Sequence, residues 1–583
     1  MGFPFGFFLC PENGNIVLPN VFSQYLTPNQ AFNSLFSMKV LNTVALFFLI
    51  HLSASAQTYT FTHDDTLRGS ITQERAWWDL QFYHLNVRVQ PQDSTLSGSV
   101  TVRYKVLQPY QTLQIDLQRP MNISRVTQDG QELAFRRDGN AFFITLLKKQ
   151  EAQKQEALVI EYSGRPHVAK RAPWDGGFSW KKDKNGLPFV ATSCQGLGAS
   201  VWWPCKDHMY DEPDSMRISV TVPKPLMDIS NGRLRSITEN NDGTRTFDWY
   251  VQNPINNYGV NVNIGNYVAW TDTLHGEKGT LDLSFYALAE NLEKAKMQFQ
   301  QVKPMLRAFE HWFGPYPFYE DGYKLVEVPY LGMEHQSSVT YGNGYQNGYL
   351  GRDLSATGWG LKWDFIIIHE SGHEWYANNI TYKDQADMWI HESFTNYSEN
   401  LYTEYHYGKD AGSDYVIGCR KLIRNDKPII GTYNVNRSGS GDMYYKGGNM
   451  LHTIRQLVND DEKWRGILRG MNKTFYHQTV TTQQIEEYMT REAGIDLSRV
   501  FDQYLRDHRL PVLEYQVEKK KISYRWNNVV EGFDMPVRYK AENGEWKLLK
   551  PSTEWKSVKA KKSTALEIDK GFYIEVKKLT SAS

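Results

Sequence analysis

The stretch WDFIIIHESGH, residues 363–373, indicates how the central part of this 583-residue chain folds. Its apolar run continues past His373 into Trp375 and Tyr376, which predicts a helix buried inside a domain. Gly372 weakens this prediction, since a glycine inside a helix costs about 1 kcal/mol relative to alanine. A glycine also allows another segment to approach closely.

Two histidines of this stretch have the spacing of metal ligands. Residues four apart lie on the same face of a helix, so His369 and His373 can bind one ion. A second segment with helical periodicity carries Glu392, and antiparallel packing against the first helix would bring Glu392 to the same ion. A catalytic zinc ion needs three protein ligands and one open position. We therefore predict one Zn²⁺ per chain, bound by His369, His373 and Glu392.

Glu370 lies beside the first histidine but points in another direction around the helix. It is a candidate general base that takes a proton from water, since zinc lowers the pKa of a bound water from about 15.7 towards about 7. The alternative for the five-residue pattern alone is a chance occurrence on a surface helix. The chemistry favoured by the residues is hydrolysis of a peptide bond.

The wider pattern resembles a known family. His-Glu-x-x-His is followed after eighteen residues by the glutamate of the frame Trp-x-x-Glu-Ser-Phe, which resembles the M1 family of zinc aminopeptidases. The resemblance implies a thermolysin-like, mainly helical catalytic domain and peptide substrates with a free N-terminus. It covers the mature chain in outline and is closest over residues 309–451.

Leu331-Gly332-Met333-Glu334-His335 resembles the family's Gly-x-Met-Glu-Asn motif. The match assigns substrate binding to Gly332, Met333 and Glu334, with Glu334 binding the α-amino group. An ammonium in a partly desolvated cleft needs such a carboxylate partner. Leu331 and His335 depart from the motif, which leaves the contacts to the peptide backbone open. For Glu334 alone, a solvated or ion-paired carboxylate is the alternative.

Tyr444-Tyr445-Lys446-Gly447 resembles the family's Tyr-x-Lys-Gly. The match assigns to Tyr444 the hydrogen bond to the oxyanion of the tetrahedral intermediate. Loss of such a donor typically costs about 2.7 to 4 kcal/mol of transition-state stabilisation. Tyr445 is the alternative tyrosine, and only the position of Lys446 and Gly447 favours Tyr444.

Two weaker matches concern supporting residues. The segment from Ser193 to Pro213 resembles, with extra residues, a family segment that ends in Pro-Cys-x-Asp-Glu-Pro. The resemblance implies that Gln195 helps to hold the substrate amine, and a turn glutamine bonded to the backbone is the alternative. Glu399 matches a position that orients a ligand histidine. An ordinary solvated glutamate is its alternative.

The sequence predicts an α+β multidomain protein. Short alternating runs from 57 to 267 predict an N-terminal antiparallel β domain. Helical periodicity dominates from 268 to 508, the predicted catalytic domain, and alternation returns in a small C-terminal β domain at 509–583. Helices are expected at 290–313, 446–460 and 462–475, and another is expected to be capped by Thr481 and Gln484.

Residues 1–56 are interpreted as a leader. A basic start, a short apolar core and the small residues Ala54-Ser55-Ala56 predict a signal peptide at 38–56. We interpret Met38 as the true start and residues 1–37 as a misassigned extension, with an extended leader as the alternative. Its apolar run of about eleven residues is shorter than the roughly 20 that span a bilayer. We expect an exported, periplasmic or secreted protein without a transmembrane segment in the mature chain.

Charge and cysteine content exclude some partners and leave other questions open. The 65 basic and 65 acidic residues balance, so nucleic acid is not an expected partner. Loss of Cys10 with the leader leaves Cys194, Cys205 and Cys419; Cys194 with Cys205 is the easier disulfide, and a buried thiol is the alternative.

Three other functions stay open. The first is a zinc endopeptidase of the thermolysin type, which uses the same zinc set without an amine anchor. The second is a leukotriene A4 hydrolase-like epoxide hydrolase, and the third is a zinc-bearing peptide-binding protein without turnover.

Overall fold

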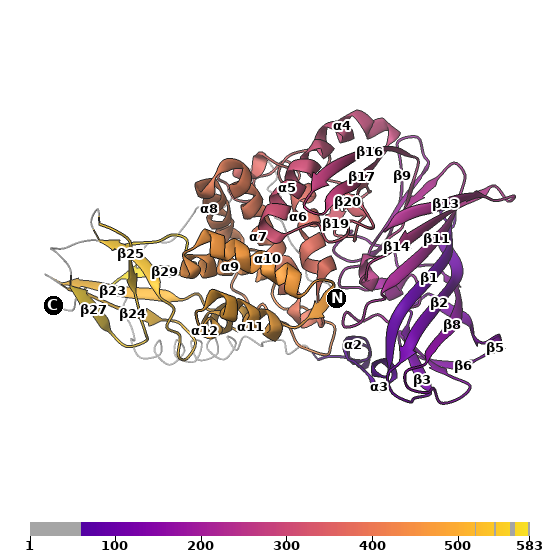
Figure 1. Cartoon of the computed structure of the whole chain (residues 1–583), viewed down its shortest axis with the longest axis horizontal. Helices are drawn as coiled ribbons and strands as arrows, with labels where there is room; N and C mark the ends of the chain where they lie inside the picture. Colours follow the sequence, from indigo (N-terminus) through magenta and orange to yellow (C-terminus); the bar gives the residue numbers. More distant parts are fainter. Residues whose placement is uncertain (1–59, 519–520, 542–543, 560–565, 581–583) are drawn as a thin grey trace, which may run out of the picture. The chain divides into compact units, whose positions relative to one another are not determined.

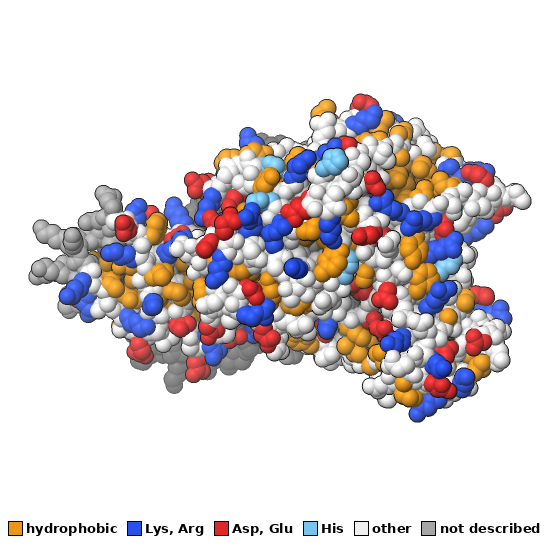
Figure 2. Space-filling model, viewed as in Figure 1, with side chains coloured by type: hydrophobic (Ala, Val, Ile, Leu, Met, Phe, Trp, Pro, Cys, Tyr) orange, Lys and Arg blue, Asp and Glu red, His pale blue; other side chains and the backbone are white. Residues whose placement is uncertain are grey.

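The computed structural model describes residues 60–518, 521–541, 544–559 and 566–580. The predicted leader and signal peptide lie outside the described residues. Within them, no helix is both long and apolar enough to cross a membrane. Figure 2 shows basic and acidic side chains interspersed over the visible face, in keeping with the balanced charge.

The first part of the described chain is built on a large sheet (Figure 1). In spatial order its strands are β13 (Arg233–Glu239), β14 (Thr244–Val251), β11 (Ser215–Pro223), β1 (Trp78–Gln90), β2 (Thr95–Val106), β8 (Gln155–Gly164), β4 (Asn122–Gln128) and β5 (Gln131–Glu132). Buried residues alternate with more exposed ones along β1 and β2, as expected of strands with one face on a core.

One strand pair departs from the predicted antiparallel pattern. β1 pairs with β11 in parallel, with Leu85 opposite Ile218, whereas β1 and β2 are antiparallel. Parallel neighbours cannot be joined by a tight hairpin, and here more than a hundred residues lie between the two strands. Alternation in the sequence predicts the faces of a strand but not the direction of its partner.

Two smaller sheets accompany the large one. The first is formed by β12 (Met227–Ile229), β15 (Asn263–Gly265), β10 (Pro188–Ser193) and β9 (Gly177–Lys182), and the second by β3 (Thr112–Asp116), β7 (Ala141–Thr145) and β6 (Ala134–Asp138). Gln195 lies two residues beyond the end of β10, in the loop before the short 3₁₀ turn Ala199–Val201.

A five-stranded sheet introduces the second part of the chain. Its order is β16 (Tyr267–Gly276), β17 (Gly279–Leu288), β18 (Tyr323–Glu327), β20 (Val339–Tyr341) and β19 (Gly332–Met333). β19 pairs antiparallel with β20, with Gly332 opposite Tyr341. This edge strand brings Glu334, the next residue along the chain, beside the helices that follow.

The helices that lie between and after the strands of this sheet in the chain, drawn from magenta to orange in Figure 1, carry most of the predicted site. They are α4 (Leu292–Gln298), α5 (Val302–Phe313), α6 (Phe365–Gly372), α7 (Trp389–Tyr407), α8 (Lys409–Gly418), α9 (Tyr445–Val458), α10 (Asp461–Thr474), α11 (Thr482–Ala493) and α12 (Ser498–Phe501). A two-stranded sheet pairs β21 (Ile380–Tyr382) with β22 (Gln478–Val480) in parallel. The capping box predicted at Thr481 and Gln484 is confirmed at the start of α11.

The single helix predicted from 290 to 313 is wrong, because the structure divides it into α4 and α5. A 3₁₀ turn, Phe299–Gln301, separates the two helices, and Pro304 stands in the first turn of α5. Proline has no N–H and its ring crowds the carbonyl four residues earlier, so it is tolerated in a first turn and not inside a helix.

The C-terminal strands form two sheets, drawn in yellow in Figure 1. One contains β27 (Lys556–Lys559), β24 (Lys521–Asn527), β23 (Val512–Glu518) and β29 (Glu575–Lys578), and the other contains β26 (Lys547–Leu549), β25 (Val537–Ala541) and β28 (Leu566–Ile568). Strand β29 begins at Glu575, after a turn in which the N–H of Phe572 donates to the carbonyl of Asp569.

Two hydrophobic clusters divide the core. Leu85 and Trp203 of the first part share a cluster with Met333, whereas Ile367 of the helical part shares the other cluster with Trp526 of the C-terminal strands. Met333 therefore packs against the first part while its neighbour Glu334 enters the site. The boundaries at 267 and 508 stay predictions.

Candidate active site

Helix α6 and the residue that follows it present two imidazoles on one side. Asp364 caps its start by accepting hydrogen bonds from the N–H groups of Ile366 and Ile367, and the helix ends at Gly372. The rings of His369 and His373 lie with their centroids 5.0 Å apart. Both histidines are buried, so an ion bound between them would be shielded from bulk water.

The end of α6 differs from the sequence expectation. The chain passes into a π-type turn, Glu374–Asn379, with non-helical backbone angles at Tyr376 and Ala377. The carbonyl of Tyr376 is thereby placed to accept a hydrogen bond from Nδ1 of His373 at 2.9 Å. The apolar residues at 375–376 are buried as predicted, but they do not continue the helix.

Helix α7 brings Glu392 to the histidines from its first turn. Oε2 of Glu392 lies 3.7 Å from Nε2 of His369 and 3.4 Å from Nε2 of His373. Gly372 makes this approach possible, since a Cβ atom built there would lie 2.6 Å from Oγ of Ser398 on α7. The predicted close approach at Gly372 is confirmed, and side chains of α7 make it.

The donor atoms at this place fit a zinc ion. His369 shares a hydrogen bond of 2.8 Å between Nδ1 and Glu399, and His373 bonds the Tyr376 carbonyl through Nδ1, so a proton on each Nδ1 leaves both Nε2 lone pairs free. Oε2 of Glu392 is buried and accepts no hydrogen bond from the residues that the structure describes. Tetrahedral ligands about 2.1 Å from zinc lie roughly 3.4 Å apart, close to the separations found here.

Glu370 lies beside this ligand set without belonging to it. Its side chain is buried, and burial raises its pKa to about 7 against the attraction of His369. Gly332 leaves space for it, because a Cβ atom on that glycine would lie 3.3 Å from Cγ of Glu370 and 2.5 Å from a methyl carbon of Ile366. The carboxylate is therefore placed where a general base would act.

Glu334 is brought close to His373 and to Glu370. One ligand atom from each of Glu334, Glu370 and His373 lies within 4.8 Å of the others. Tyr258, in the 3₁₀ turn Asn257–Gly259, donates its hydroxyl to Oε1 of Glu334 at 3.0 Å. Burial raises the pKa of Glu334, so this carboxyl is set up to be stabilised by a cationic partner.

The residue that replaces asparagine in the motif is buried. Nδ1 of His335 lies 3.2 Å from Oγ1 of Thr340, while Nε2 has no hydrogen-bond partner within the described ranges. Burial lowers the pKa of His335 to about 3, which keeps the ring neutral. The carbonyl of Leu331 accepts a hydrogen bond of 2.7 Å from the N–H of Gly342. Both departures are therefore accommodated within the β19–β20 region.

The two adjacent tyrosines at 444 and 445 face different neighbours. The Tyr444 ring lies 6.1 Å from that of His369, and loss of hydration together with the charge of Glu392 raises the pKa of Tyr444 well above its usual value. Burial raises the pKa of Tyr445, and the next largest influence on it is the charge of Glu399, which shares a hydrogen bond with Nδ1 of His369. The structure thus places Tyr444 at the ligand set, and its phenol stays protonated.

Gln195 also enters this cluster. Its Nε2 donates a hydrogen bond to Oε1 of Glu392 at 2.9 Å. The amide therefore contacts a ligand of the predicted metal, where the sequence led us to expect a contact to the substrate amine. The cysteines on either side of this region, Cys194 and Cys205, are buried free thiols, so the disulfide considered from the sequence is not formed.

Comparisons with known proteins agree with this geometry. The model of the peptidase family M1 domain matches residues 297–504, and that of the peptidase M1 N-terminal domain matches residues 80–258. The chain belongs to peptidase family M1.

Relatives in family M1 are distant. Probable aminopeptidase 2 of Sulfurisphaera tokodaii is 21% identical over 426 residues, covering 69% of this chain and 51% of the relative. Leukotriene A-4 hydrolase of Xenopus laevis is 22% identical over 443 residues, covering 71% of this chain and 68% of the relative. The chain spans about half the length of several curated relatives that it matches.

Solved structures show the same fold in family M1. The M1 zinc metallopeptidase of Deinococcus radiodurans superimposes with a TM-score of 0.62 at 22% identity, covering 75% of this chain and 95% of that one. Its fold supports the predicted arrangement of a β-rich part followed by a helical catalytic part.

Tyr258 is the site residue that the sequence did not reveal. It lies in a turn-rich segment, Asn253 to Gly259, without a charged residue or a recognisable catalytic spacing. The turn is fixed when Asn256 accepts a hydrogen bond from the N–H of Gly259 at 2.7 Å. Only the tertiary structure brings this hydroxyl to a carboxylate 76 residues away.

Proposed function

We propose that this M1 peptidase is a zinc-dependent aminopeptidase that hydrolyses the N-terminal peptide bond of peptides. The observation that carries the proposal is the proximity of two buried carboxylates with different surroundings, Glu334 and Glu370, beside His373. An α-ammonium bound by Glu334 places the first peptide bond of a substrate within reach of Glu370.

His369, His373 and Glu392 would hold the zinc ion. When bound, zinc supplies Lewis-acid chemistry that polarises the peptide carbonyl and makes water a better nucleophile at neutral pH. Glu399 and the Tyr376 carbonyl fix the orientation of the two imidazoles through their Nδ1 atoms.

The remaining steps belong to residues of the chain. The Glu370 carboxylate accepts a proton from the attacking water and passes it to the leaving amine, which requires one group to act first as base and then as acid. The Tyr444 hydroxyl donates a hydrogen bond to the oxygen on which negative charge develops. Its raised pKa keeps the proton on the phenol for this purpose.

The Glu334 environment favours an aminopeptidase over an endopeptidase. The carboxylate is 2% exposed and already accepts one hydrogen bond from Tyr258 at Oε1. Leaving a buried carboxylate without a cation is costly, so an ammonium partner from the substrate explains its presence. Relatives named aminopeptidases, and a related mutant enzyme from Deinococcus radiodurans bound to a Tyr-Ser-Ala substrate, support this choice.

A panel of aminoacyl fluorogenic substrates tests the proposal. We expect hydrolysis by the wild-type protein, loss of hydrolysis with a chelator and its return with zinc. Failure to hydrolyse every member of the panel, while peptides blocked at the N-terminus are cleaved, would favour the endopeptidase.

The proposal includes export of the protein. It is supported by the basic start, apolar core and small residues of 38–56. Intact-mass analysis of protein secreted from a suitable host should give a mature chain beginning at Gln57. A chain that retains residues 38–56 would contradict export by this signal.

A further inference from the structure

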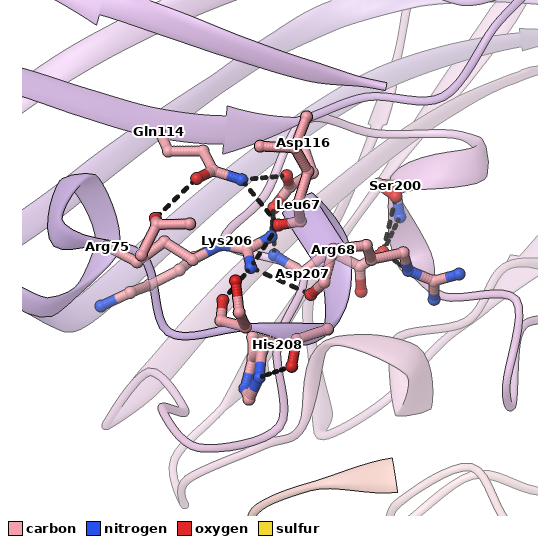
Figure 3. Close-up of polar contacts among 12 residues, drawn as sticks. Leu67, Arg68, Arg75, Gln114, Asp116, Ser200, Lys206, Asp207 and His208 are labelled. Carbon is pink, nitrogen blue, oxygen red and sulfur yellow. Dashed lines mark hydrogen bonds and ion pairs between the residues drawn. The ribbon is translucent and has the colours of Figure 1, made fainter. Parts of the chain in front are cut away.

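Helix α2 (His63–Gly69) contacts the loop that carries Gln195, although it precedes the region matched by the family models. Nη2 of Arg68 donates a hydrogen bond of 3.1 Å to the carbonyl of Gly196. Nε of Arg68 lies 3.4 Å from Oδ2 of Asp207, and Figure 3 shows both of these side chains. A side chain from the beginning of the described chain is thereby attached to the residue next to Gln195.

The end of α2 is itself held firmly. Arg75 is fully buried, and its Nη1 donates to the carbonyls of Leu67, Arg68 and Ser70 at 3.0, 2.9 and 2.8 Å. Its second terminal nitrogen, Nη2, pairs with Asp116 of β3 at 2.5 Å. The carbonyls at the end of a helix lack partners inside the helix, so this arginine fixes the helix that presents Arg68.

A segment of the catalytic part contacts both α2 and the loop that carries Gln195. A Cβ atom on Gly69 would lie 2.0 Å from the backbone nitrogen of Asn436, so α2 and this segment are in backbone contact. Nδ2 of Asn436 donates to the Gly196 carbonyl at 3.3 Å. Gly196 is thus the meeting point of three parts of the chain.

The loop needs these contacts to keep its course. Gly196 and Gly198 both have positive φ angles, 74° and 91°. A Cβ atom on Gly198 would lie 2.1 Å from Nη2 of Arg68 and 2.2 Å from Oδ2 of Asp207. Because glycine has no Cβ atom, both groups can pack against the loop. A small cavity lined by Gly196, Gly198 and Tyr258 lies beside the loop, so packing on that side is incomplete.

We propose that Arg68 is a positioning residue for Gln195 and, through it, for the ligand Glu392. Arg68 fixes the Gly196 carbonyl, the adjacent Gln195 amide then holds Oε1 of Glu392, and Oε2 is left facing the histidines. The inference rests on the proposed function for the identity of the metal, zinc.

A double-mutant cycle on zinc affinity tests this inference apart from peptidase activity. Competition with a chromogenic chelator would give the zinc dissociation constant for wild type, Arg68→Ala, Gln195→Ala and the double variant. Loss of a group that supports a metal ligand weakens binding about 10- to 100-fold. We expect Gln195→Ala to fall in this range, Arg68→Ala to weaken binding severalfold, and the double variant to bind no more weakly than Gln195→Ala.

The control variants separate positioning from general loss of structure. Arg68→Lys, which keeps a positive donor near Asp207 and Gly196, should restore at least half of the lost binding free energy. Arg88→Ala, on an exposed ion pair with Asp242, should leave zinc affinity unchanged. Thermal unfolding of each apoprotein checks that the variants are folded.

Two results would overturn the inference. Additive losses in the double variant would show that Arg68 acts without Gln195, and wild-type affinity in Arg68→Ala would show that it does not act on the ligand set. If Arg68→Ala fails to fold, Arg68→Met provides the same test, because it keeps the apolar stem and removes the donors to Gly196 and Asp207, while Asp207 still accepts a hydrogen bond from Ser200. Wild-type affinity in that variant would equally contradict the inference. If wild type binds zinc but cleaves no aminoacyl substrate, the proposed function fails and the cycle still decides the role of Arg68.

Discussion

Gln195 donates a hydrogen bond of 2.9 Å to Glu392, a residue 197 positions later in the chain. The donor follows strand β10 and the acceptor lies in the first turn of α7, so two parts of the fold share one predicted metal ligand. The bond occupies Oε1 and leaves Oε2 for the ion. The N-terminal β part therefore contributes a residue, Gln195, to the site itself.

The base assignment predicts a separation of turnover from metal binding. Glu370→Gln should lower kcat by about 10² to 10⁴, the usual contribution of a general base, with one zinc per chain retained. Steady-state kinetics and metal analysis of the same sample would measure both. His373→Ala is the contrasting variant and should lose zinc as well as turnover. Wild-type kcat in Glu370→Gln would remove this residue from the mechanism.

The different neighbours of the adjacent tyrosines predict different consequences of removing each hydroxyl. Tyr444→Phe should lower kcat by about 10² to 10³, since a hydrogen bond to the developing oxyanion is lost. Tyr445→Phe is a matched control, because the main charge acting on its hydroxyl is that of Glu399 and not that of the ligand Glu392, and we expect less than a twofold change. Equal effects of the two substitutions on kcat would mean that the assignment to Tyr444 is wrong.

Tyr258 should act on substrate binding. Tyr258→Phe removes the hydroxyl that holds Oε1 of Glu334, and a hydrogen bond to a charged group is worth about 1.5 to 3 kcal/mol. We expect KM for aminoacyl substrates to rise about tenfold with little change in kcat. Tyr250→Phe, on β14, is a control for loss of a tyrosine hydroxyl in the same part of the chain. An unchanged KM in Tyr258→Phe would show that this hydroxyl does not prepare the amine site.

The carboxyl of Glu212, which is not one of the predicted zinc ligands, should make the stability of the folded chain depend on pH. Burial raises its pKa from 4.5 to about 8, with a hydrogen bond from Thr381 opposing the shift. The folded chain then keeps a proton that the unfolded chain has lost, so this group reduces stability progressively as pH rises from about 4.5 to about 8. Glu212→Gln removes that loss.

Thermal unfolding at pH 5 and pH 8 would measure this effect. The Tm of Glu212→Gln minus that of wild type should increase between the two values by about 2 °C or more. Glu531→Gln, at an exposed position, is the control and should show no such increase. A difference that decreases from pH 5 to pH 8 would contradict the sign of the shift.

The helical part of the fold was largely predictable because its signals are local. Apolar periodicity located α9 and α10 to within a residue or two, and the capping residues located the start of α11. Pro304 was a local signal for the break between α4 and α5 that the periodicity concealed. The parallel pairing of β1 with β11 had no local signal, since it depends on where the intervening strands lie.

The residues of the site were likewise predictable where their signals are local in the sequence. The spacing of His369 and His373 and the resemblance at Glu392 predicted which residues meet, because helix geometry and a known pattern define them. Tyr258 and Arg68 could not be found in this way, since each acts through a contact between distant segments. For Gln195, the resemblance indicated the right place in the site but not its bond to Glu392.

A comparison of matched peptides tests the central claim most directly. Hydrolysis of one short peptide would be followed with its α-amino group free and with that group acetylated, before chelation, after chelation and after addition of zinc. We expect release of the first residue from the free peptide only, loss of this activity in the chelated sample and its recovery with zinc. Equal cleavage of the acetylated peptide, or full activity in protein shown to be free of metal, would contradict a zinc aminopeptidase that recognises its substrate through Glu334.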